Sequence, residues 1–133
     1  MILLPSSDSN YLAERFTSES YSISSEGNMT CLVFHNFRLP KGFDRETSNL
    51  LLRFQPGYPD VAPDMWWFDP PVRREDGQNI PATEAIEHYL GRGWQRWSRH
   101  LPAGQWRSGI DGVESFLALL RKDLEKYVPR LPQ

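Results

Sequence analysis

Three closely spaced prolines most constrain how this chain can fold. Pro56, Pro59 and Pro63 fall within eight consecutive residues. Each proline lacks an N–H donor, so the segment can be neither a helix nor the interior of a sheet. We therefore expect a fixed turn here. The apolar runs on either side, residues 48–54 and 65–68, are predicted to be two strands that this turn connects.

Two more strands are predicted upstream. Residues 21–24 alternate between polar and apolar, and residues 29–37 form an apolar run suited to burial on both faces. Residues 25–28 are predicted to form the turn between them. Cys31, the single cysteine, is interpreted as a core residue, because a buried free cysteine behaves as a small hydrophobe. Four strands in sequence with short connections favour an antiparallel meander.

The C-terminal region has the clearest helical pattern. Residues 111–114 have a capping-box pattern, and apolar side chains then recur at helical spacing up to residue 128, just before Pro129. Near the N-terminus, Ser9 and Asn10 are predicted to cap a short helix over residues 11–16. Strands followed by a helix predict one α+β domain over residues 1–133, with the long helix packed across the sheet.

Composition excludes several classes of function. The net charge of −2 argues against a general phosphate-binding surface, so no nucleic-acid partner is expected. One cysteine cannot form a disulfide framework or a cysteine-based zinc site, and it fits a reducing cytoplasm. The aspartates do not have the spacing of a calcium loop, so we expect no metal and no cofactor. No sequence window is apolar enough to predict a membrane span.

Residues 93–106 are predicted to carry the activity. They hold three of the five tryptophans, together with Ser98 and His100, and no helical or strand period runs through them. Their glycines and proline indicate a long, irregular, ordered segment, and such segments are often functional. The preceding residues 83–90 are predicted to form a short helical turn that ends at Gly91. The alternative is an aromatic plug that seals a small core, with Ser98 a plain surface hydroxyl.

The proline turn also carries a resemblance. The pattern Phe54-x-x-x-Tyr58-Pro59-x-x-x-Pro63 at the end of a predicted strand resembles the Tyr-Pro-x-x-x-Pro signature of ubiquitin-conjugating enzymes. The resemblance covers residues 29–124, with an insertion of about fifteen residues after the turn, as loops tolerate. It implies a UBC-like fold: a four-stranded antiparallel meander, a short N-terminal helix, a long irregular active-site segment and a C-terminal helix on the sheet.

The same resemblance implies the position of the catalytic residue. In those enzymes a catalytic cysteine stands eight residues before a tryptophan that precedes a helix. Counting back eight residues from Trp106 gives Ser98, and counting back ten more gives His88, where the family's His-Pro-Asn motif begins. The chain departs from this family pattern at two positions. The cysteine position holds a serine, and the position of the oxyanion-stabilising asparagine holds Leu90.

Three further motifs are similar to the prokaryotic family E of such proteins: Leu39-Pro40-x-Gly42, residues 58–65, and Trp97-Ser98-Arg99-His100. This implies a ubiquitin-like protein and an activating enzyme as partners, with an operon-associated peptidase, in bacterial conjugation systems linked to anti-phage defence. Two alternatives stay open. The chain is then either a UBC-fold module that only binds a ubiquitin-like protein, or an RWD-like interaction domain.

Serine chemistry at this position would need assistance. A serine hydroxyl is a weak nucleophile at neutral pH and requires a base within hydrogen-bond reach. His100, two residues from Ser98, is the first candidate base, and His88 is the second if its helix folds back. Stabilisation of the oxyanion is expected from Arg96, Arg99 or the amides around Gly91 and Gly93, without a choice among them.

Each of these residues also has a simpler interpretation. Arg96 and Arg99 are expected either to meet the ubiquitin-like tail or an acidic partner, or to be solvated. Trp97 belongs to the same candidate binding surface. Its alternative is to anchor the loop, the usual role of a tryptophan.

Overall fold

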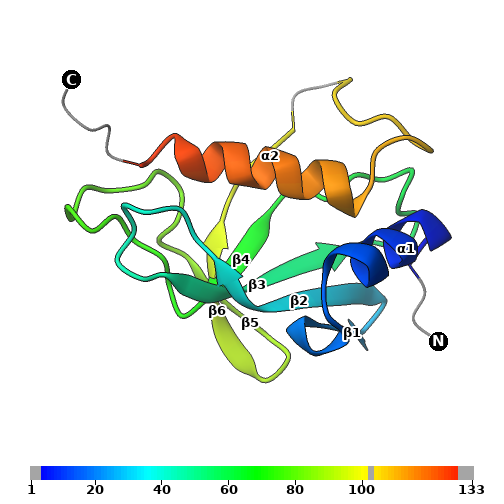
Figure 1. Cartoon of the computed structure of the whole chain (residues 1–133), viewed down its shortest axis with the longest axis horizontal. Helices are drawn as coiled ribbons and strands as arrows, with labels where there is room; N and C mark the ends of the chain where they lie inside the picture. Colours follow the sequence, from blue (N-terminus) through cyan, green and yellow to red (C-terminus); the bar gives the residue numbers. More distant parts are fainter. Residues whose placement is uncertain (1–3, 102–103, 129–133) are drawn as a thin grey trace.

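The computed structural model describes residues 4–101 and 104–128, which form an α+β fold (Figure 1). One long helix lies across a face of an antiparallel sheet, and a shorter helix lies near the N-terminus. The helices are α1 (Ser6–Arg15), the 3-10 turn η1 (Ser18–Ser20) and α2 (Val113–Glu125). The strands are β1 (Tyr21–Glu26), β2 (Met29–Arg38), β3 (Thr47–Phe54), β4 (Trp66–Asp69), β5 (Ile86–Tyr89) and β6 (Arg92–Trp97). None of the helices in this described part is long and apolar enough to span a membrane.

The first four strands form the predicted meander, but the sheet is larger than expected. Its six strands lie in the order β1-β2-β3-β4-β6-β5, and every neighbouring pair is antiparallel. The prediction of a four-stranded sheet is therefore wrong. So is the predicted helical turn over residues 83–90, where β5 lies. The first part of the segment expected to be irregular, residues 93–97, belongs to strand β6, which pairs with the free edge of β4.

A two-residue turn makes the additional hairpin possible. Tyr89 pairs with Arg92, and Leu90 and Gly91 between them have φ angles of 55° and 77°. A type I′ turn needs positive φ at both central positions, and its backbone twist matches the right-handed twist of the flanking strands. Leucine rarely adopts this conformation, so the sequence does not predict a type I′ turn here.

The main core lies between the sheet and α2. The predicted apolar stripe of the C-terminal helix is confirmed, although the helix ends at Glu125 rather than at residue 128. Side chains alternate along the strands, so one set faces the helix and the other faces away. The buried residues that form the helix side of this core include Leu32, Phe34, Leu50, Leu52, Phe116, Leu117 and Leu120.

A second, smaller core covers the opposite face of the sheet. It contains Cys31, Val33, Leu51, Trp67 and Trp94. Cys31 is fully buried there, which confirms it as a core cysteine. The hairpin turn closes over this core, because the Leu90 N–H donates to a Glu26 carboxylate oxygen at 2.7 Å. The Arg53 guanidinium also lies 3.8 Å from the centre of the Tyr89 ring.

The polar insertion between β4 and β5 is anchored rather than loose. Val72 is fully buried and Ile80 is almost fully buried in the main core. The buried Gln95 of β6 accepts a hydrogen bond from the Val72 N–H at 2.7 Å and donates one to the Val72 carbonyl at 3.1 Å. The insertion is thereby attached to the strand that leads to Ser98.

The caps of both helices differ from the sequence prediction. Helix α1 begins at Ser6, so Ser9 and Asn10 lie inside it and cap nothing. Helix α2 does begin at Val113, but the Asp111 carboxylate accepts a bond from the Arg107 N–H instead of capping the helix. A carboxylate from α1, that of Asp8, caps α2. The cap comes from a residue distant in sequence, which a local pattern cannot reveal.

Candidate functional site

The proline turn holds the segment that follows β6. The Trp106 indole N–H donates to the Pro59 carbonyl at 2.7 Å, and its ring packs 6.2 Å from the ring of Tyr58. The Ser108 hydroxyl donates to the Asp60 carboxylate. Residues far apart in the sequence therefore form one unit, and the turn holds the segment from residue 104 to the start of α2.

Ser98 lies immediately after β6. Its N–H donates to the Ala82 carbonyl at 3.0 Å, which extends the strand ladder by one bond. The residue is half-buried, and its hydroxyl makes no hydrogen bond to any residue in the described ranges. The preceding Trp97 is fully buried and stacks on Trp66 with ring centres 6.1 Å apart. Trp97 thus anchors the site from inside the core and presents no binding surface.

His100 lies close to the carboxylate of Asp64, a residue that the sequence pattern did not indicate as part of the site. Its Nδ1 is 3.4 Å from an Asp64 carboxylate oxygen, and the histidine side chain is 71% exposed. No hydrogen bond joins Ser98 and His100 in this arrangement of the described residues. Asp64 directly follows the last proline of the turn. That position is the sequence feature that could have identified Asp64 as a site residue.

His88 is separated from Ser98. It lies on β5 opposite Gly93, which is five positions before Ser98 along the chain. At about 3.4 Å per residue this is roughly 17 Å, beyond the reach of a proton transfer. The fold-back that would have made His88 a base does not occur, because its segment is a strand. The amides around Gly91 and Gly93 lie at the same distant end of the hairpin.

The two arginines expected to bind a partner are held by internal contacts. Arg99 donates from Nε to Asp123 at 2.8 Å, from Nη1 to the Pro81 and Ser98 carbonyls at 2.9 Å, and from Nη2 to the Tyr127 hydroxyl at 3.3 Å. It therefore joins the site segment to α2. Arg96 forms an ion pair with Glu87 at 3.0 Å and is about one-third exposed. Of the two, only Arg96 retains an accessible face.

A shallow depression lies beside Ser98. It has a volume of about 370 Å³ and is lined by Ala82, Glu84, Ala85 and Arg96. The Ala85 carbonyl accepts a bond from the Arg96 N–H at 2.8 Å, so the depression lies where the chain before β5 pairs with β6. Within residues 4–101 and 104–128, no three His, Cys, Asp or Glu side chains group together as metal ligands would.

A comparison with protein families decides the class. The family described as Prokaryotic E2 family E matches residues 4–127. The chain belongs to this family. As an E2-like protein it is a carrier of the conjugating-enzyme type, whose general partners are a ubiquitin-like protein and an activating enzyme. No curated protein and no solved structure matches the chain.

Proposed function

We propose that this E2-like protein accepts the C-terminus of a bacterial ubiquitin-like protein on the Ser98 hydroxyl as an oxyester and transfers it to an amine. One observation carries the proposal. The Ser98 hydroxyl has no hydrogen-bond partner among the described residues, while the Ser98 backbone N–H is held by the Ala82 carbonyl at 3.0 Å. A nucleophile must be both positioned and accessible, and half-buried Ser98 meets both conditions.

Two acyl transfers would follow. First, Ser98 Oγ attacks the thioester carbonyl on the activating enzyme. An O–C bond forms, the C–S bond breaks, and the hydroxyl proton passes through a base to the leaving thiolate. Second, an amine attacks the oxyester. A C–N bond forms, the C–O bond breaks, and the amine proton returns to the serine oxygen. An oxyester is less activated than a thioester, so this step needs a stabilised oxyanion.

His100 is the proposed base and Asp64 its positioning residue. With Nδ1 facing the Asp64 carboxylate, Nε2 of the ring is available for proton transfer. The exposed ring would have to turn toward Ser98 when a tail binds. Catalytic hydrogen bonds are often long in the unliganded state and shorten only in the complex.

The tail of the ubiquitin-like protein is proposed to approach along the depression beside Ser98. Ala82 and Ala85 leave room for an extended backbone, and Arg96 offers a positive charge to the carbonyl oxygens of the tail, whose terminal carboxyl is already esterified. Glu87 neutralises part of that charge, so the attraction is modest.

A second function is favoured by a different observation. No base is hydrogen-bonded to Ser98, and Arg99 is used entirely by structural contacts in the described residues. A UBC-fold module that binds a ubiquitin-like protein without carrying it would have this arrangement. The two functions make opposite predictions for a covalent adduct.

The deciding experiment mixes the protein with the activating enzyme of its own operon, ATP and the ubiquitin-like protein. The carrier function predicts an adduct that resists thiol reductant, is cleaved by mild base, and is absent in Ser98→Ala. Ser18→Ala is the matched control, since it removes an exposed hydroxyl from η1, outside the site segment, and it should retain the adduct. Ser98→Cys should give a reductant-sensitive adduct in larger amount.

The binding-module function predicts no adduct in any of these proteins, together with saturable binding that Ser98→Ala leaves unchanged. An adduct that persists in Ser98→Ala would show that another residue is the nucleophile and would end the serine mechanism.

A further inference from the structure

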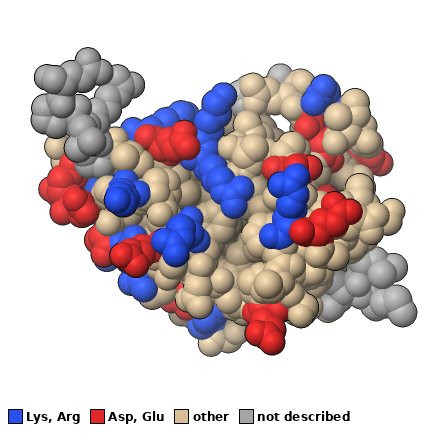
Figure 2. Space-filling model, in the orientation of Figure 1, with Lys and Arg blue, Asp and Glu red and all other residues tan. Residues whose placement is uncertain are grey.

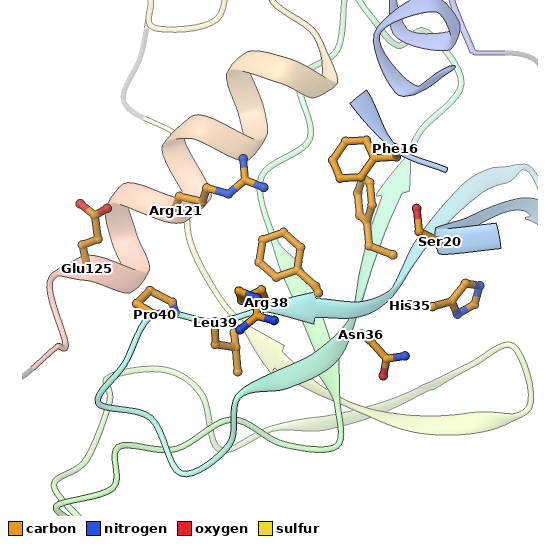
Figure 3. A pocket seen from close by; sticks show the side chains of 11 residues that line it. Phe16, Ser20, His35, Asn36, Arg38, Leu39, Pro40, Arg121 and Glu125 are labelled. Atoms are coloured by element: carbon orange, nitrogen blue, oxygen red, sulfur yellow. The ribbon is translucent and has the colours of Figure 1, made fainter. Parts of the chain in front are cut away.

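A groove lies on the flank of α2 where β2 extends beyond its neighbour (Figure 3). Its volume is about 500 Å³. The aromatic floor is formed by Phe16, Phe34 and Phe37, with ring centres 5.0 Å apart for the first pair and 6.2 Å for the second. Arg38 and Arg121 line its rim. The groove therefore combines an apolar floor with two positive charges.

Strand β2 presents an open edge along this groove. Pairing with β1 ends where Tyr21 meets Phe34, whereas β2 continues to Arg38. No described strand pairs with the β1 side of residues 35–38. The register to β3 also shifts here, and Asn36 has a φ of 54°. An unpaired edge of a strand is a template for an extended peptide.

The charge of the groove selects the kind of peptide. Arg38 and Arg121 take part in no ion pair within the part of the chain that the structure describes. The Arg121 guanidinium lies 5.3 Å from the centre of the Phe37 ring, and Figure 3 shows it reaching from α2 toward the groove. Glu125, the acidic lining residue, lies at the far end of the view from Phe16 and Ser20.

The surface around the groove does not carry a large patch of a single charge sign. Basic and acidic side chains are interspersed over the face in Figure 2. Recognition would therefore depend on the two arginines themselves, whose attraction is short-range at physiological ionic strength.

We propose that this groove binds an extended acidic peptide segment of a partner protein. An apolar side chain of the peptide packs on the phenylalanine floor, and its carboxylates pair with Arg38 and Arg121. Its backbone adds to the open edge of β2 beyond the bulge at Asn36, whose own N–H bonds the Asn49 side chain at 3.1 Å. A lipid or phosphate ligand would not use that edge, and a basic peptide would be repelled.

This site is separate from Ser98. Arg121 and Asp123 are two positions apart on α2, so at about 100° per residue they point to opposite flanks of the helix. Asp123 bonds Arg99 of the site segment, whereas Arg121 lines the groove. A partner in the groove would leave the tail-binding side open, so it could remain bound during transfer.

Fluorescence anisotropy tests the proposal with a fluorescein-labelled octapeptide, Gly-Glu-Thr-Leu-Thr-Glu-Thr-Gly, whose glutamates and leucine share one face when it is extended, and a matched peptide with lysine in place of glutamate. We expect saturable binding of the acidic peptide, no binding of the lysine peptide, and about tenfold weaker acidic-peptide binding for Arg38→Glu and for Arg121→Glu. Lys122→Glu, a charge reversal at the next position of the same helix, should change binding less than twofold by the same reasoning. Ser98→Ala should bind as the wild type does.

Amide chemical shifts should move at residues 35–38 and not at residue 98, and thermal unfolding should show that each variant is folded. No saturable binding of the acidic peptide up to about 1 mM overturns the proposal. So does equal binding to Arg121→Glu, or competition by inorganic phosphate alone, which would indicate only an anion site. A dimer in sedimentation that Arg121→Glu dissociates would assign the groove to a second copy of the chain and would also overturn it.

Discussion

The Asp8 carboxylate lies 2.9 Å from the Val113 backbone nitrogen, so the N-terminal helix caps the C-terminal one. Its other oxygen accepts the Tyr58 hydroxyl at 2.6 Å. Asp8 is only 4% exposed, and a Cβ added at Gly112 would lie 2.5 Å from it. Burial, together with the hydrogen bond and the charge of Asp8, raises the pKa of Tyr58. One side chain thus joins both helices to the proline turn.

Replacing Asp8 should therefore destabilise the whole fold. Asp8→Ala removes a helix cap and leaves the buried Tyr58 hydroxyl without its partner, which together cost about 2–3 kcal/mol. Urea unfolding measures this. Asp111→Ala is the control and should cost well under half as much, since Asp111 bonds within an exposed turn. Equal losses in the two variants would contradict the capping role of Asp8.

The Trp106 indole should hold the site segment in place. Trp106→Phe keeps an aromatic ring but loses the hydrogen bond to Pro59, a net loss of about 1 kcal/mol. Amide hydrogen exchange should become faster in residues 104–112. Trp94→Phe is a matched control, because it loses the Trp94 bond to the Tyr89 carbonyl in the hairpin. Its faster exchange should appear in β5 and β6, and acceleration of residues 104–112 in both variants would argue against a specific role.

Glu87 should contribute stability that is lost in acid. Burial alone would raise its pKa, but bonds from Trp67 and Tyr89 and the charge of Arg96 outweigh it and hold the pKa of Glu87 below its usual value. A carboxylate with a lowered folded pKa stabilises the protein above the unfolded value of 4.5, and that contribution disappears as the pH falls through the folded pKa.

The measurement compares wild type with Glu87→Gln by urea unfolding at several pH values. The variant should be less stable at pH 7, and the difference should shrink below about pH 4.5 as Glu87 becomes protonated. A difference that stays constant with pH would mean that the Glu87 charge is not what stabilises the hairpin.

Cys31 should be structural and not catalytic. Burial raises the pKa of its thiol, and the bond from Arg53 only partly offsets this, so the thiolate is disfavoured. Cys31→Ser should cost about 1–3 kcal/mol, since it buries a hydroxyl among Val33, Leu51 and Trp94. Cys31→Ala, which buries no hydroxyl, is the matched variant.

Any transfer activity should survive in both proteins. Because Cys31 is the single cysteine, these variants contain no thiol at all. Loss of the adduct in a folded variant would overturn the choice of Ser98 as nucleophile.

The sequence alone determined the elements whose signals are local. Proline stereochemistry required the turn after β3. The spacing of apolar residues predicted α2, β2 and β3, because an element buried on one or both faces has apolar side chains that recur at helix or strand spacing. The resemblance carried by Tyr58, Pro59 and Trp106 gave the family, and the structure shows why these residues occur together: they contact one another.

Tertiary structure decided the rest, because the deciding partners are distant in the sequence. β5 and β6 are strands since β4 offers a free edge. His100 contacts Asp64 and makes no hydrogen bond to Ser98 among the described residues, and Asp8 caps a helix that begins 105 residues later. Arg99 was predicted to bind a partner, but its guanidinium donates hydrogen bonds to Asp123 on α2 and to Tyr127 just beyond it. A side chain's hydrogen bonds go to whatever the fold brings within about 3 Å, and sequence spacing does not report that distance.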